Sequence, residues 1–289
     1  MNKSANANKK KSLFVMTCKR VWHDPTAMIG LIGAIVMIIL AILAPVICKY
    51  TPTEMDLMAI KQAPSATHIF GTDELGRDVF ARCIYGGRYS IALGIMASGL
   101  SIIIGVVLGS LAGYYAGAVD VIIMRFCDII QSIPAMVISI IVSLVLGNGY
   151  IVTVFALAFG GFTFSTWLMR GQVLSVRTAE YLDAARTINC SSGRIMFKHI
   201  LPNTFSPLLL QFTMQISHMI QLSASLSVVG LGVQPPTPEW GAMLSSGRNL
   251  MTNYPHLVIF PGLCIFLISL LVNMFGDGLR DALDPKLKK

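Results

Sequence analysis

The chain has 289 residues, of which 54% are apolar and only 12% are charged, and its formal net charge is +8. This composition excludes an ordinary soluble globular domain and is typical of a protein that crosses a membrane several times. The basic excess does not indicate a nucleic-acid-binding protein. The lysines and arginines are spread over tails and loops beside apolar runs, without interleaved aromatic residues that could stack on bases.

Runs without Asp, Glu, Lys or Arg mark the expected transmembrane helices, since one crossing takes about 20 apolar residues. Five such runs are present, and they cover residues 25–48, 89–119, 129–169, 199–238 and 249–276. The third run is about twice as long as one crossing requires. Its centre, Gly147-Asn148-Gly149-Tyr150, is a turn signal that divides it into two helices. The sequence therefore predicts an all-α membrane protein with six transmembrane helices.

Six crossings place both termini on one side of the membrane, and the basic residues indicate which side. With a cytoplasmic N-terminus, 16 of the 22 lysines and arginines lie inside and 6 lie outside, whereas the acidic residues divide almost evenly. Both termini are therefore expected in the cytoplasm. The basic N-terminus followed by an apolar run is similar to a signal peptide, but this run is too long and five more spans follow it. We interpret it as a retained first helix.

The predicted organisation has four parts. They are a basic cytoplasmic segment (1–24), a first helix with an extracytoplasmic segment (25–88), a core of five helices (89–276) that includes the polar loop 170–202, and a cytoplasmic tail (277–289). In the extracytoplasmic segment, Asp73 is expected to cap a helix starting at Glu74, and Asp78 to pair with Arg82 on its exposed face. In the proline-rich stretch after 234, Trp240 is expected to anchor at the membrane interface.

The sequence lacks the common catalytic motifs. It has no GxxxxGK[ST] loop, no GxSxG elbow and no HExxH, and its six cysteines show no metal-ligand spacing. The chain is therefore expected not to be an enzyme and to bind no cofactor or metal. The predicted spans also lack the charged residues that ion-coupled carriers use as proton relays or ion sites. An autonomous channel or carrier is accordingly a remote alternative.

The loop between Arg170 and Pro202 is the most polar insert of the core. Residues 179–186 form a strongly helix-favouring stretch, and Ser191 or Ser192 can cap a second short helix. Small Ala184 and Ala185 permit close approach of another surface, while the charged residues nearby can fix its register. From these residues alone, a docking helix and an ordinary solvated helix are equally acceptable interpretations.

Three stretches resemble one family. Residues 180–202 are similar to the EAA loop of bacterial ABC-importer permeases: Asp183-Ala184-Ala185 stands for Glu-Ala-Ala, Asn189 for Gly and His199 for Ile, and Leu201-Pro202 closes the motif. Residues 68–80, and the pair 230–241 and 276–285, resemble segments of the C-type permease of dipeptide, oligopeptide and nickel importers. The chain is thus identified as a member of this inner-membrane permease family.

The resemblance implies a mechanism. Two different permease chains pair in the bacterial cell membrane, two cytoplasmic ATPase subunits bind ATP and Mg, and an extracytoplasmic binding protein delivers the cargo. The loop would sit in a groove on one ATPase. The residues that map onto this coupling region are Glu180, Asp183, Ala184, Ala185, Arg186, Asn189, Leu201 and Pro202. The implied cargo is a short peptide, and nickel or a metal chelate is the alternative.

Polar residues in the fifth predicted span are candidates for the translocation path. Gln211, Gln215, His218 and Ser225 recur on one helix face with Gln221 at its margin. Because polar side chains are costly in lipid, this face is expected to point inward, where it either lines a path or bonds to neighbouring helices. His218 and Met219 are conceivable ligands of a transition metal. A single histidine beside a methionine is also common in apolar helices.

Overall fold

The computed structural model describes residue 17 and residues 19–283, except the side chains of Asp183, Arg186 and Phe205. The described part is helical, and its only β pairing is an isolated bridge between Thr72 and Asp78. The long helices are α2 (Pro25–Ile42), α4 (Val79–Tyr115), α7 (Tyr150–Arg177), α10 (Leu201–Val228) and α12 (His256–Leu283). The short ones are α3 (Ala44–Ile47), α5 (Gly117–Gln131), α6 (Ala135–Leu146), α8 (Glu180–Thr187), α9 (Ser192–Ile195), the π-helix η1 (Met196–Ile200), α11 (Trp240–Gly247) and the 3₁₀-helix η2 (Arg248–Leu250).

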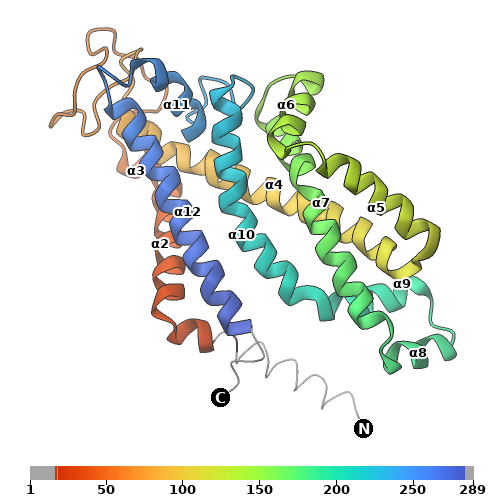
Figure 1. Ribbon diagram of the computed structural model, residues 1–289. Coiled ribbons are helices and arrows are strands. Elements are labelled where there is room, and N and C mark those ends of the chain that lie inside the picture. The colour runs from red at the N-terminus through yellow and green to blue at the C-terminus, as the bar shows by residue number, and fades with distance from the viewer. Residues whose placement is uncertain (1–16, 18, 284–289) are drawn as a thin grey trace.

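Four helices, α2, α4, α7 and α12, are long and apolar enough to cross a membrane. The pair α5 and α6 adds a fifth crossing if it is one broken span. Helix α10 is also long enough to cross a membrane, but with its polar side chains it is less apolar than these four helices. The start of α2, the end of α12 and α8 lie at one end of the molecule (Figure 1), as an even number of crossings requires. The count of six and the cytoplasmic side of the termini stay predictions.

The third predicted run differs from expectation in one respect. The turn at 147–149 is confirmed, because α6 ends at Leu146 and α7 begins at Tyr150. A second break lies at 132–134, where α5 and α6 meet at 91° and Pro134 starts the new helix without a backbone N–H to donate. Helix α5 begins at Gly117, before the apolar run, and therefore carries Asp120, Arg125 and Asp128. If this broken pair is one span, the expectation that no span contains a charged residue does not hold for it.

The centre of the fold is the contact between α4 and α7. Gly105, Gly109 and Gly113 of α4 lie directly against the backbone and Cβ atoms of α7 from Ser165 to Val173. Glycines spaced by four residues form one face of a helix, and their lack of side chains permits close approach of a second helix. Helix α10 packs on the other flank of α4, where Gly94 meets Ile216 and Ile220. These contacts fix α7 and α10, and with them the loop that joins these two helices.

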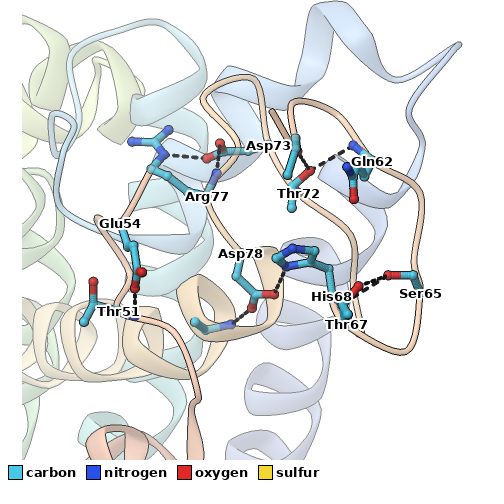
Figure 2. A network of polar contacts seen from close by, with 12 residues as sticks. Thr51, Glu54, Gln62, Ser65, Thr67, His68, Thr72, Asp73, Arg77 and Asp78 are labelled. Carbon is cyan, nitrogen blue, oxygen red and sulfur yellow. Dashed lines mark hydrogen bonds and ion pairs between the residues drawn. The ribbon is translucent and has the colours of Figure 1, made fainter. Parts of the chain in front are cut away.

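The segment between α3 and α4 folds into a polar cap at the end of the bundle opposite α8, called the outer end after the predicted topology (Figure 1 and Figure 2). Asp78 is the N-cap of α4: it accepts a hydrogen bond from the Ala81 N–H at 2.7 Å and another from His68 Nδ1 at 2.9 Å. Asp73 binds Arg77 Nε at 2.6 Å and lies 3.5 Å from Arg82 Nε. Asp73 therefore caps no helix at Glu74, and Arg82 pairs with Asp73 and not with Asp78. The spacing in the sequence predicted the wrong partners for Asp73 and Asp78, because the fold of the whole segment between α3 and α4 decides which side chains meet.

Residues 239–247 fill the outer end between α4 and α10. Trp240 is 2% exposed and donates its indole N–H to the Cys83 carbonyl at 2.8 Å, so the expected interfacial anchor is a core residue instead. Glu239 caps α11 by accepting a hydrogen bond from the Ala242 N–H at 2.7 Å. It also accepts hydrogen bonds from Ser90 of α4 at 3.1 Å and from Ser227 of α10 at 3.4 Å. One buried carboxylate thus joins three helices.

Burial raises the pKa of Glu239, and hydrogen bonds from Gly241, Ala242, Ser90 and Ser227 oppose the rise. The folded protein then binds a proton more tightly than the unfolded chain, so unfolding free energy falls as pH rises from the ordinary carboxyl pKa through the raised value. We expect Glu239→Gln to flatten this part of the stability profile, measured by thermal unfolding in detergent from about pH 4 to about pH 8. The exposed Glu54→Gln is the control, and an unchanged profile for Glu239→Gln would contradict the assignment.

Candidate coupling surface and translocation face

The polar loop is attached to the membrane helices by a small apolar core. Leu182 and Ala185 of α8 are buried, and they belong to a cluster that also contains Met169, Val173, Ile195, Ile200 and Leu208. These partners come from α7, α9, η1 and α10. Both ends of the loop and its central helix therefore share one core, which joins α8 to α7 and α10.

The opposite side of α8 has no cover within the described chain. Tyr181 and Ala184 are exposed, and Ile188, directly after the helix, is 75% exposed. Positions 184 and 188 lie on one helix face, and the exposed Glu180 and Thr187 lie beside them, so this surface has a small apolar centre bordered by polar residues. Tyr181 lies at its edge, where its hydroxyl accepts a hydrogen bond from Asn203. Ala185 faces the chain's own core, which corrects the expectation that both alanines meet another surface. Glu180 is exposed, while the side chains of Asp183 and Arg186 lie outside the described residues.

Asn189 ends the helix at a left-handed backbone angle, with φ of +57°. Glycine adopts this region without cost, and asparagine is among the few other residues that tolerate it. This geometry gives a physical reason for Asn189 at the position where the EAA pattern has Gly.

We expect Asn189→Val to loosen α8, because a β-branched residue is strained at positive φ by about 1–2 kcal/mol. Amide hydrogen exchange across residues 180–188 should become roughly tenfold faster, since about 1.4 kcal/mol corresponds to a factor of ten. Asn189→Gly is the matched control and should keep the wild-type rate. Because Asn189 is exposed, equal rates for both variants would show that the backbone angle is not what matters.

The end of the motif forms the junction with α10. Leu201 and Pro202 are the first two residues of α10, where proline has a favourable φ and needs no hydrogen-bond partner. Asn203 donates to the His199 carbonyl at 2.7 Å and to the Tyr181 hydroxyl at 3.2 Å. The residue in place of the usual isoleucine thus lies in a polar contact between α8 and α10.

On the other flank, Arg170 ties α7 to α5. Its Nε and Nη2 atoms donate to the two carboxylate oxygens of Asp120 at 2.5 and 2.6 Å. A two-point contact between guanidinium and carboxylate fixes orientation as well as distance. The inner ends of α5 and α7 are therefore held together where the loop begins.

The polar face predicted for α10 is present, but one of its predicted residues, Gln215, does not belong to it. His218, Gln221 and Ser225 are exposed in this chain, and Gln211 is partly exposed beside Met214. Gln215 is buried and donates to Ser101 of α4 at 2.8 Å, so it belongs to the helix packing. The remaining residues form a continuous uncharged polar stripe that points away from α4.

The structure disfavours a joint metal site at His218 and Met219. Met219 is fully buried against α4 and α7, whereas His218 lies on the exposed stripe, because adjacent helical residues point about 100° apart. Among the described residues, no group of three or more His, Cys, Asp or Glu side chains could hold a metal ion.

Comparison with known proteins identifies the chain. Residues 105–289 match the family described as binding-protein-dependent transport system inner membrane component. The chain belongs to this family. Residues 12–64 match the N-terminal transmembrane domain of oligopeptide transport permease C.

Several relatives in this family of inner-membrane components cover most of the chain. The oligopeptide transport system permease protein OppC of Bacillus subtilis is 38% identical over 98% of this chain and 93% of its own length. The dipeptide transport system permease protein DppC of Alkalihalophilus pseudofirmus is 40% identical over 93% and 89%. The glutathione transport system permease protein GsiD of Pectobacterium atrosepticum is 45% identical over 81% and 77%.

Solved structures support the fold of this inner-membrane component. A chain of the MetNI methionine ABC transporter, in an inward-facing conformation, aligns with a TM-score of 0.56 and 17% identity over 70% of this chain and 96% of its own. A chain of an amino acid ABC transporter with histidines aligns with a TM-score of 0.53 and 15% identity, covering 68% and 92%. These chains share the all-helical fold of ABC-importer permeases.

Proposed function

We propose that the chain is a permease subunit of an ATP-driven importer of short peptides and forms half of the translocation path. The relatives whose sequences align along most of this chain are named for oligopeptide, dipeptide and glutathione transport. The observation that carries the proposal is the loop on α8: Leu182 and Ala185 are buried in a core shared with residues of α7 and α10, and the other side exposes Ala184 and Ile188. That construction suits a helix that transmits force from a separate protein.

The partners follow from this construction. Two ATPase subunits would bind ATP and Mg and move α8, a second homologous permease would face the stripe on α10, and a binding protein would deliver cargo at the outer end. This chain would itself hydrolyse nothing and hold no nucleotide. The uncharged stripe of α10 agrees with a cargo that is polar and variable in sequence, since amide and hydroxyl groups contact peptide backbones without selecting a charge.

The test is transport by the reconstituted complex. Proteoliposomes holding the chain, its companion permease, the ATPases and the binding protein should accumulate labelled dipeptide or oligopeptide only with ATP. Accumulation of nickel and not of peptide would show that the cargo is nickel and not a short peptide. Transport by this chain in the absence of every companion subunit would remove the proposed role altogether.

A further inference from the structure

A second polar feature lies on the same side of the molecule as the polar stripe of α10. A hollow of about 490 Å³ is lined by Asp128, Gln131 and Ser132 at the end of α5 and by Phe164 and Trp167 of α7. It forms where the broken pair bends, because α6 turns away from α5 at 91° and leaves this part of α7 uncovered. The hollow combines a carboxylate, an amide, a hydroxyl and two aromatic rings.

The hollow opens on the side of α7 that points away from α4, as the packing of α7 and α10 indicates. Helix α7 turns Ser165, Thr166 and Met169 toward the glycines of α4, so Phe164 and Trp167 point away from α4. The stripe of α10 points away from α4 as well, and Gly161 of α7 lies against Met219 and Gln215 of α10. The hollow and the stripe therefore adjoin on one side of the molecule.

The other side of α4 has the opposite character. Its exposed residues there are apolar, and they include Ile95, Met96, Ile103, Val107 and Leu111. Such a row is typical of a helix face in lipid, whereas exposed charges in a span are rare there and face water or protein. Arg125 and Asp128 of α5 are 78% and 41% exposed among exposed apolar residues of the same helix, and the cost of charges in lipid favours water or protein at these two positions.

The charges around the hollow leave Asp128 able to bind a cation. Arg125 Nη1 and Asp128 Oδ2 form an exposed ion pair at 3.6 Å, which is too long for a hydrogen bond. Arg170 lies over Trp167, with 5.8 Å between its guanidinium and the ring centroid, and its Nε and Nη2 atoms are bound to Asp120. An exposed pair of this kind is weak, so an ammonium group can replace Arg125 at the Asp128 carboxylate.

We infer that Asp128 binds the terminal ammonium group of a peptide in transit, and that Phe164 and Trp167 accommodate its first side chain. A carboxylate beside aromatic faces is the usual arrangement for recognising an ammonium group, through charge-assisted hydrogen bonds and cation–π attraction. Gln131 and Ser132 offer further oxygen acceptors. This inference rests on the proposed peptide import and adds the chemical group by which the chain contacts its cargo.

The experiment uses the full transporter complex in vesicles without the binding protein, so that the binding protein's own selectivity does not enter. A cysteine at Gln131 (Gln131→Cys) reports occupancy of the hollow through its alkylation rate, followed at that residue by mass spectrometry. A dipeptide with a free amino terminus should slow alkylation at a concentration about tenfold lower than its N-acetylated form does. Loss of one charge-assisted contact accounts for a factor of this size.

The variants separate charge from packing. Asp128→Asn should abolish the difference between the two peptides, and Asp128→Glu should keep it. Asp56→Asn, the same change in the exposed segment between α3 and α4, should also keep it, because Asp56 does not line the hollow. Equal protection by both peptides in the wild type, or an undiminished difference in Asp128→Asn, would overturn the inference. Uptake measured in parallel with the binding protein present distinguishes the two failures: no peptide uptake by the wild type refutes peptide import itself.

Discussion

Replacing Gly105 by alanine is expected to destabilise the protein by about 2 kcal/mol, because the added methyl group has no room in the contact between α4 and α7. A Cβ atom at this position would lie 2.7 Å from the Ser165 carbonyl carbon and 2.8 Å from the Thr166 nitrogen. Both are backbone atoms of α7, so the helix as a whole must move to make room. Because α7 also leads into the coupling loop, Gly105→Ala should lower transport as well as stability.

The matched control is Gly99→Ala in the same helix. Its added Cβ would meet only Phe212 Cε2 at 3.9 Å, an ordinary contact. Alanine costs less conformational entropy than glycine in a helix, so this variant should gain about 0.5 kcal/mol. Thermal unfolding in detergent measures both variants. Changes of the same sign would show that helix propensity, and not the contact with α7, controls the result.

Long periodic features of this protein were predictable from its sequence. The apolar runs around 25–42, 89–115 and 256–276 need no partner to be recognised, because lipid imposes the same requirement on every crossing. The turn at 147–149 was equally local. The polar stripe of α10 followed from helical spacing, with the exception of Gln215, whose partner Ser101 belongs to another helix.

The features that were missed depend on contacts distant in sequence. Asp128 precedes an apolar run by one residue, and only the bend at Pro134 shows that it lines a hollow with Trp167. Tryptophan is a residue type that often anchors at the membrane interface, yet the indole of Trp240 is buried and bonded to Cys83 of α4. Ala184 and Ala185 look equivalent in the sequence. Only the buried cluster around Leu182 shows that Ala185 is buried and Ala184 is exposed.

The outward face of α8 leads to the second large expected effect. Ile188→Asp should abolish ATP-driven uptake and weaken binding of the ATPase subunits by at least about tenfold, because an apolar contact side chain becomes a charge that must be desolvated on association. Ile188 is 75% exposed, so the variant should insert and fold as the wild type does. Co-purification of the ATPases with the tagged permease measures the association, and the uptake assay measures the coupling.

Leu57→Asp supplies the comparison, since Leu57 is 70% exposed but lies in the segment between α3 and α4, at the other end of the molecule (Figure 1). The two substitutions alter hydrophobicity and charge equally, so only their location differs. Leu57→Asp should leave ATPase binding intact. If Ile188→Asp retained its ATPases and its uptake, α8 would not be the surface through which the importer is driven, and the exposed side of this helix would need another partner.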